Sequence, residues 1–195
     1  MREVVLDIET IPCTAAEWGV LTAKAPSLKK KLREESALDW SLGHIVCVGM
    51  LILEQERERE LCITGPDEAD VLRQFWKQIR TDDYLIGHNL LGFDLPYIQA
   101  RSVICQAKPS RSLDLRRYST ATIYDTMQVW ANWDRQHFPK LETLTAVLDL
   151  GGKGGSGDMV SKWVESNDWE RIKEYCMQDV RLTRDIYLRF KEYGL

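Results

Sequence analysis

The sequence predicts an α/β domain of three layers, in which helices flank a mixed five-stranded sheet. Three observations carry this prediction. Two apolar runs near the N-terminus, at 3–9 and 44–53, have the length and composition of buried strands. Shorter runs at 61–64, 84–88 and 122–124 supply further strands, in an order that gives both antiparallel and parallel pairing. Helical periodicity then dominates the C-terminal half of the chain.

The first strand carries two acids on one face. In VVLDIET, residues 4, 6 and 8 are aliphatic and face one side, while Asp7 and Glu9 leave the other side about 6.6 Å apart along the backbone. A first strand in such a domain is expected to be central and covered on both faces. A cation between the two carboxylates is therefore favoured over the alternative, a solvent-facing strand surface.

The next elements are an excursion, a hairpin and a helix. Residues 14–40 read as helical and include the charged run LKKKLREE. The segment EQERERE, which precedes the third strand, is either a hairpin connection or a strand edge. Pro66 and Asp67 then open a helix with apolar residues at helical spacing. These residues are Val71, Leu72, Phe75, Trp76 and Ile79.

Asp94 follows the fourth strand in GHNLLGFDLPYI. The carboxyl ends of strands are where open α/β sheets bind ligands. The alternative is that Asp94 caps the helix that Pro96 helps to open, and Asp94 considered alone favours the cap.

The C-terminal part of the chain is expected to be mostly helical after a polar, basic loop at 105–120. Helical patterns occur at 126–134, 141–150 and 158–166. Asp125, at the end of the fifth strand, is interpreted as the cap of the following helix rather than as a supporting acid. The glycine-rich segment 151–157 lacks the offset of a P-loop and is interpreted as a helix end with a flexible connection.

The last helix, capped by Asn167 or Asp168, carries an acid on its inward face. The inward stripe comprises Trp169, Ile172, Cys176, Val180, Thr183, Tyr187 and Phe190. Asp179 lies on this stripe, and Tyr175 projects from the same side four residues earlier. A bare carboxylate there costs several kcal/mol, and no Lys or Arg stands four residues away on either side. Metal ligation is favoured over a core salt bridge to a distant residue.

Four acids from three separated segments are therefore expected to meet: Asp7, Glu9, Asp94 and Asp179. Carboxylate oxygens are the ligands that hard divalent cations such as Mg²⁺ and Mn²⁺ choose.

Composition and charge narrow the class of protein. With 195 residues, 44% hydrophobic and 29% charged, the chain is expected to form one domain over residues 1–195. The N-terminus runs directly into a strand pattern and no window of 18 uncharged apolar residues occurs, so we expect a cytoplasmic protein. A net charge of −4 argues against holding nucleic acid by bulk electrostatics. Bound metal ions would reverse the sign of the electric field at the site, so the net negative charge does not exclude a nuclease.

The cysteines indicate a reducing environment. They are odd in number, widely spaced and without a CxxC pair, which favours reduced thiols over disulfides or a zinc site. The five are Cys13, Cys47, Cys62, Cys105 and Cys176.

LDIET, NLLGFD and YCMQD resemble, in this order, the three exonuclease motifs of the DnaQ-like 3′–5′ exonuclease superfamily, whose fold is RNase H-like. The resemblance extends from Val4 to Phe190. Within the superfamily, the chain is similar to predicted 3′–5′ exonucleases related to the exonuclease domain of family-B DNA polymerases. Tyr175 stands four residues before Asp179, and Glu174 rather than His stands five before it. The chain thus resembles the tyrosine (DEDDy) branch.

This resemblance implies two divalent ions, Mg²⁺ or Mn²⁺. Asp7, Glu9 and Asp179 would bind one ion, and Asp7 would bridge to a second that Asp94 holds directly or through water. Tyr175 would position the attacking water. The implied reaction is hydrolysis from the 3′ end of nucleic acid, with release of nucleoside 5′-monophosphates. Single-stranded or frayed DNA is favoured as the substrate, and RNA stays open.

Substrate contacts are expected from a second set of residues: Thr10, Asn89, Phe93, Arg116 and Arg117. For the two arginines the alternative is solvated surface charge. Trp130 and Trp133 are further candidates for stacking on bases.

Two other functions stay open at this level. One is an RNA-trimming or structure-specific nuclease with the same site, and the other is a nucleic-acid-binding module without catalysis. DNA repair, nucleic-acid turnover and mobile-element contexts all fit the sequence.

Overall fold

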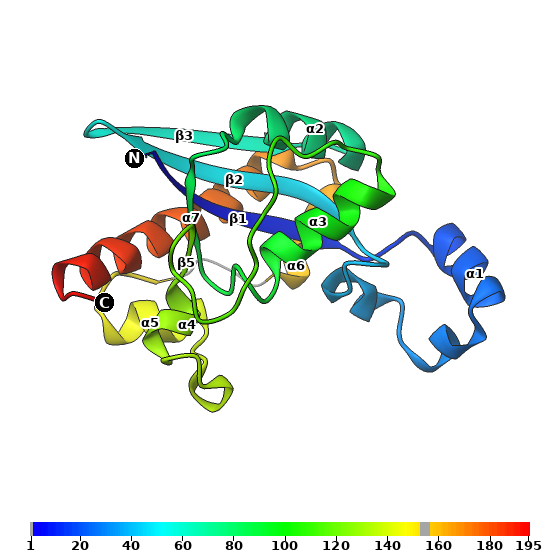
Figure 1. The fold of residues 1–195 in the computed structure, drawn as a ribbon. Coiled ribbons are helices and arrows are strands. Elements are labelled where there is room, and N and C mark those ends of the chain that lie inside the picture. The colour runs from blue at the N-terminus through cyan, green and yellow to red at the C-terminus, as the bar shows by residue number, and fades with distance from the viewer. Residues whose placement is uncertain (1, 153–156) are drawn as a thin grey trace.

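The computed structural model describes residues 2–152 and 157–195, and its centre is a mixed sheet with strand order β3-β2-β1-β4-β5 (Figure 1). Its strands are β1 (Glu3–Ile11), β2 (His44–Glu54), β3 (Arg57–Thr64), β4 (Tyr84–Gly87) and β5 (Ile123–Asp125). Strands β1, β2 and β3 pair antiparallel, whereas β4 and β5 run parallel to β1. The predicted mixed five-stranded sheet is confirmed.

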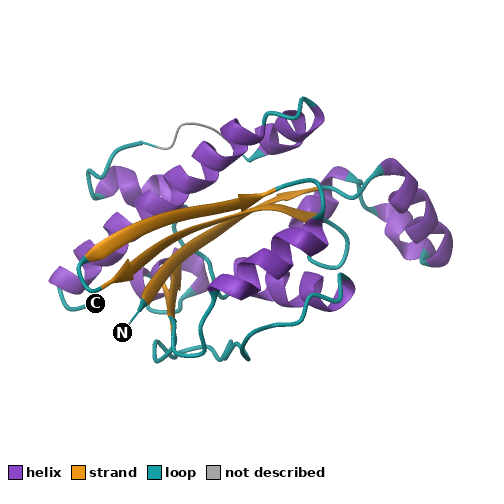
Figure 2. Cartoon of the chain, turned by 90° about the horizontal axis from the view of Figure 1, so that it is seen from above, coloured by secondary structure: helices purple, strands orange, loops and turns teal. Residues whose placement is uncertain are grey.

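Helices cover both faces of the twisted sheet and form the two outer layers (Figure 2). The α-helices are α1 (Ala15–Lys24), α2 (Glu68–Gln78), α3 (Asp94–Ile104), α4 (Thr126–Trp130), α5 (Leu141–Val147), α6 (Asp158–Glu165) and α7 (Trp169–Glu192). Short 3₁₀ helices are η1 (Pro26–Lys30), η2 (Glu34–Leu38) and η3 (Arg135–His137). None of the helices in the described ranges is both long and apolar enough to cross a bilayer.

Strand β1 is central and buried on both faces, as its pattern predicts. Val4 and Leu6 pack with residues of α2 and α3, whereas Val5 packs with Val180 of α7. Burial of each such aliphatic side chain contributes about 1.5–3 kcal/mol, so this two-sided packing fixes the position of β1.

The excursion between β1 and β2 lies beyond the C-terminal end of β1, away from the sheet (Figure 1). It was expected to be helical over 14–40, and it forms α1 followed by η1 and η2. Helix α1 buries none of its residues and begins with a capping box formed by Thr14 and Glu17.

The third strand begins at Arg57 rather than at residue 61, so the strand-edge interpretation of EQERERE applies to residues 57–60. Gln55 and Glu56 have φ values of 51° and 61°, the left-handed geometry of a tight two-residue hairpin turn. The alternating charges that follow suit an exposed edge strand, because charged side chains discourage pairing with another chain.

Two helices end earlier than their apolar patterns predict. Helix α4 stops at Trp130 instead of 134 because Asn132 and Trp133 adopt φ values of 47° and 64°. Helix α5 stops at Val147 instead of 150, and Asp149 has a φ of 54°. The fifth strand is shifted by one residue from 122–124. Residues 153–156 of the glycine-rich segment lie outside the described residues.

Helix α7 begins after Asp168, whose side chain accepts a hydrogen bond from the backbone N–H of Arg171. Asp168 rather than Asn167 is therefore the cap. The predicted inward stripe of α7 is confirmed, with Ile172, Cys176 and Val180 all fully buried.

Candidate metal centre

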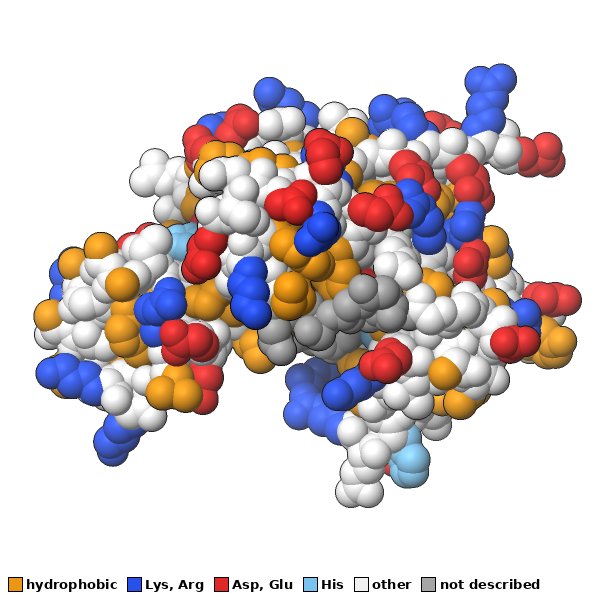
Figure 3. All heavy atoms as spheres, turned by 180° about the vertical axis from the view of Figure 1, so that it is seen from behind, with side chains coloured by type: hydrophobic (Ala, Val, Ile, Leu, Met, Phe, Trp, Pro, Cys, Tyr) orange, Lys and Arg blue, Asp and Glu red, His pale blue; other side chains and the backbone are white. Residues whose placement is uncertain are grey.

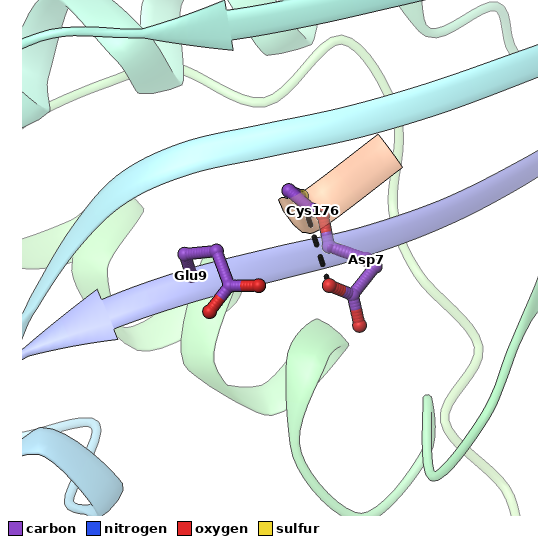
Figure 4. Close-up of side chains that lie close together, drawn as sticks. All are labelled: Asp7, Glu9 and Cys176. Carbon is purple, nitrogen blue, oxygen red and sulfur yellow. Dashed lines mark hydrogen bonds between the residues drawn. The ribbon is translucent and has the colours of Figure 1, made fainter. Parts of the chain in front are cut away.

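Asp7 and Glu9 leave the same face of β1, and Cys176 reaches Asp7 from α7 (Figure 4). One ligand atom from each of these three residues lies within 4.8 Å of the others. The Cys176 Sγ is 3.6 Å from Asp7 Oδ2. Two carboxylates and a thiol thus converge where β1 passes under α7.

Asp94 lies at the edge of β1 that faces β4, whereas β2 pairs with the other edge. Strand β4 pairs only with residues 3–5 of β1. Beyond these residues, the N-terminus of α3 lies against the same edge of β1. The backbone N–H of Ile8 donates a hydrogen bond to Asp94 Oδ1 over 3.1 Å. The N-cap residue of α3 is Phe93, without a side-chain hydrogen bond, so the interpretation of Asp94 as a cap is wrong. Asp94 instead binds the backbone between Asp7 and Glu9.

The electrostatics of Asp94 connect it to the other acids. Burial raises the pKa of Asp94 well above its usual range, and the negative charge of Asp7 raises it further. The residue is only 3% exposed. A cation between Asp7 and Asp94 would offset both effects, because a bound divalent ion is the largest local charge in such a site.

Asp179 and Tyr175 are buried on the inner face of α7. Asp179 follows Cys176 by three residues, about 4.5 Å along the helix axis, so the contact between Cys176 and Asp7 brings this part of α7 to β1. The ring of Tyr175 packs edge-on against Trp163, with ring centroids 5.5 Å apart. Arg181, which also follows on α7, pairs with Glu60 and Glu174 on the surface.

The close approach of α7 depends on Gly49 of β2. Asp7, Gly49 and Cys62 are direct cross-strand partners on β1, β2 and β3. A Cβ atom at Gly49 would lie 2.8 Å from the Cys176 Sγ, closer than real Cβ contacts. Glycine therefore leaves the space in which α7 meets the sheet beside Asp7.

Cys176 is a neighbour of Asp7, although its sequence pattern indicates only a core residue of the last helix. Hydrogen bonds to Cys47 and Cys62, together with burial, raise the pKa of the Cys176 thiol well above its usual value. It is thus a neutral neighbour of Asp7, not a third anion. Its place three residues before Asp179 on one helix face was the signal in the sequence.

Asp125 is both a helix cap and a support for the turn before Asp94, so the choice between the two roles was wrong. Its carboxylate caps α4 by accepting hydrogen bonds from the backbone N–H groups of Met127 and Gln128, which confirms the predicted cap. The same carboxylate accepts from the N–H groups of Asn89 and Leu91. Asn89 has a φ of 60°, so Asp125 stabilises the turn that leads into Asp94.

A cleft of about 670 Å³ opens beside this turn. Asn89 and Arg117, two of the predicted substrate contacts, line it, as does the stacking candidate Trp133. Trp133 and Tyr118 form a tilted aromatic pair with centroids 5.3 Å apart. Other lining residues include Trp40, Pro96, Gln128, Arg135 and Phe138.

The remaining predicted substrate contacts interact with other parts of the protein. The hydroxyl of Thr10 donates to the carbonyl of Ala37 over 2.7 Å. Phe93 packs against Tyr97, with centroids 5.3 Å apart. Arg116 forms an exposed ion pair with Asp114, and Trp130 stacks on Phe190.

The donor chemistry fits hard divalent cations. Asp7 and Glu9 offer carboxylate oxygens at short mutual distance, and Asp94 is a buried acid beside them. A mixed sheet of this order, with acids on its central strand facing the last helix, defines an RNase H-like fold of the exonuclease type.

The chain belongs to a particular family with this fold. A family model described as "Predicted 3′-5′ exonuclease related to the exonuclease domain of PolB" matches residues 38–194. The matched range includes Asp94, Tyr175 and Asp179, whereas Asp7 and Glu9 precede it. No curated protein matches the chain. Exonuclease domains of this kind normally use divalent metal ions.

Proposed function

We propose that this protein is a metal-dependent 3′–5′ exonuclease that hydrolyses phosphodiester bonds at the 3′ end of single-stranded or frayed nucleic acid, DNA rather than RNA. The observation that carries the proposal is the meeting of Asp7 and Glu9 with α7, beside buried Asp94, in a chain of this exonuclease family. The products are nucleoside 5′-monophosphates.

Asp7, Glu9 and Asp179 would hold one Mg²⁺ or Mn²⁺ ion, and Asp7 with Asp94 would hold a second. When bound, the ions activate the attacking water and stabilise the negative charge that develops on the phosphoryl group and leaving oxygen. The hydrogen bond from the Ile8 backbone to Asp94 orients that carboxylate toward the site.

Tyr175 positions the attacking water by a hydrogen bond from its hydroxyl group. Phenols are weak bases near neutral pH, so orientation rather than proton abstraction is its role. The edge-on contact with Trp163 supports this role because it restrains the ring.

The residues that line the cleft favour a single-stranded substrate. Among the residues that the structure describes, its lining includes Arg117 and Arg135 but no acid, in a protein whose net charge is −4. Aromatic rings with interspersed arginines are the surface that unpaired bases and their phosphates recognise. Acidic and basic side chains are interspersed over much of the face seen from behind (Figure 3).

We further propose that the chain acts as one domain in the cytoplasm. The helices of both outer layers pack on one sheet, and all five cysteines are free thiols, which suits a reducing compartment.

The proposal is tested with 5′-labelled DNA and RNA oligonucleotides, each with a free or blocked 3′ end, in the presence of Mn²⁺. We expect stepwise shortening of DNA with a free 3′ end and none with a blocked end. Asp7→Asn and Asp179→Asn should lower the rate by about 1,000-fold or more. The surface variant Asp82→Asn is the matched control and should retain wild-type rate.

Full activity in both acid variants would refute the site. Faster shortening of RNA would favour an RNA-trimming enzyme, and Mn²⁺ binding without any cleavage would favour a binding module.

A further inference from the structure

Three of the five cysteines lie together beside the carboxylates, on the face of the sheet that α7 covers. The Sγ atoms of Cys47 and Cys62 are 3.2 Å apart. Hydrogen bonds link both thiols to Cys176, which in turn contacts Asp7. These cysteines are far apart in the sequence, and only the fold brings their thiols together.

The strand register explains why the thiols adjoin the carboxylates. Cys62 lies opposite Gly49, which lies opposite Asp7. One step along the sheet, Cys47 lies directly opposite Glu9. Direct cross-strand partners share a face, so both acids and both strand thiols project toward α7.

The two strand thiols differ in access and reactivity. Cys62 is only partly buried on edge strand β3, whereas Cys47 is fully buried. Hydrogen bonds from Cys176 and Cys47, aided by the charge of Lys173, lower the pKa of the Cys62 thiol. An accessible thiolate is the form of cysteine that attacks electrophiles.

We propose that Cys62 and Cys47 are a site of reversible oxidation by hydrogen peroxide, and that their disulfide inactivates the adjacent carboxylate site. The second half of this proposal rests on the proposed exonuclease function.

The chemistry has two steps. The Cys62 thiolate attacks one oxygen of the peroxide, so that a sulfur–oxygen bond forms, the oxygen–oxygen bond breaks and hydroxide leaves. The sulfur of Cys47 then attacks the Cys62 sulfur, forming the disulfide, and the hydroxyl group leaves as water with the proton of Cys47. In total, one thiolate and one thiol are oxidised to the disulfide, and one peroxide is reduced to one hydroxide and one water.

The disulfide would disturb the metal ligands. The two Sγ atoms must close from 3.2 Å to about 2.05 Å, a movement of about 1 Å. Cys47 is the strand partner of Glu9, and Cys176 joins the thiols to Asp7. Metal sites tolerate ligand displacements of only about 0.2 Å, and a misplacement of about 1 Å can cost roughly 100-fold in rate.

The experiment exposes the full-length protein to hydrogen peroxide and follows three readouts. These are the Cys47–Cys62 link in non-reduced peptides by mass spectrometry, the affinity for Mn²⁺ without nucleic acid, and Mn²⁺-dependent cleavage. We expect the link to form, Mn²⁺ affinity and cleavage each to fall at least about 10-fold, and dithiothreitol to restore both.

Variants identify the residues responsible. Cys62→Ser should keep its activity and Mn²⁺ affinity after peroxide treatment, and Cys62→Ala serves if the serine variant unfolds. Cys105→Ser is the matched control: Cys105 is also partly buried but lies against Glu68, and this variant should respond like the wild type.

Absence of the Cys47–Cys62 link, or equal sensitivity of Cys62→Ser and the wild type, would overturn the proposal. A link that leaves Mn²⁺ affinity unchanged would also overturn it. Because the link and the affinity do not require cleavage, a protein without nuclease activity would refute the proposed function and leave this test intact.

Discussion

Tyr175 offers the sharpest test at the scale of single residues. Tyr175→Phe removes the hydroxyl group and retains the ring that packs on Trp163. We expect the single-turnover cleavage rate to fall by about 100-fold or more, because a positioned hydrogen bond to the attacking water is lost. Affinity for Mn²⁺ should stay within about twofold of the wild type. The exposed Tyr193→Phe is the control, and a large loss of Mn²⁺ affinity in Tyr175→Phe would make Tyr175 structural.

His44 gives the molecule a stability that depends on pH. Its Nδ1 lies 3.1 Å from Glu68 and also 3.1 Å from Arg101, and its Nε2 lies 3.0 Å from Glu17. The hydrogen bond to Glu68 is the main cause that raises the pKa of His44 in the folded state. The resulting stabilisation is complete below the unfolded pKa of about 6.5 and is lost as pH rises through the folded pKa.

The prediction is checked by thermal unfolding of the wild type and of His44→Gln at pH values from below the unfolded pKa of His44 to above its folded pKa. We expect the wild type to exceed the variant by about 1 kcal/mol or more in acid and the difference to shrink in alkali. His137→Gln, at an exposed site, should change stability little at either pH. A difference that grows with pH would contradict the assignment.

Residue chemistry alone indicates four candidate ligands, because each of the four carboxylates stands among apolar neighbours. It also identifies Asp125 as a cap, because Asp at a strand–helix junction is a local signal. It does not reveal Cys176 as a neighbour of Asp7, because that contact depends on how closely a helix and a sheet pack.

Among the elements, the packing of α7 on β2 is set by one missing side chain. Gly49→Ala would place a Cβ atom within 3.2 Å of Cys176, Val180 and Met177, all on α7. We expect a loss of about 1–3 kcal/mol in the free energy of unfolding, measured in urea, together with weaker Mn²⁺ binding as α7 moves away from Asp7. Gly65→Ala is the matched control, since nothing lies within 4 Å of its added Cβ. Equal stability of the two variants would contradict this account.

Strands and long helices follow from local patterns, whereas some of their ends do not. The alternation in β1 and the stripe of α7 are long enough to identify each element. The ends of α4 and α5 depend on left-handed residues such as Trp133 and Asp149, which carry no glycine or proline signal. The start of β3 depends on its pairing with β2. The charged residues at 57–60 give no local signal for this pairing.

For the whole molecule, the local charge of the cleft predicts how nucleic acid binds. Arg117 lines the cleft, whereas neighbouring Arg116 is paired with Asp114 outside it. Arg117→Ala should weaken binding of a single-stranded oligonucleotide and reduce its salt slope by about 1, because one phosphate contact is lost. Arg116→Ala is the matched control and should leave the slope unchanged. The measurement is fluorescence anisotropy with Ca²⁺ at several salt concentrations, and the reverse ranking would exclude the cleft as the path of the strand.

The arrangement around Asp125 bears on how inactive variants are interpreted. This one carboxylate gathers the N–H groups of Asn89, Leu91, Met127 and Gln128, and so secures the turn before Asp94 without belonging to the metal centre. A genetic screen scored only by lost cleavage would recover Asp125 together with the four acids proposed as ligands, and would count it as a fifth ligand. Titration of each inactive variant with the metal separates the scaffold from the ligands.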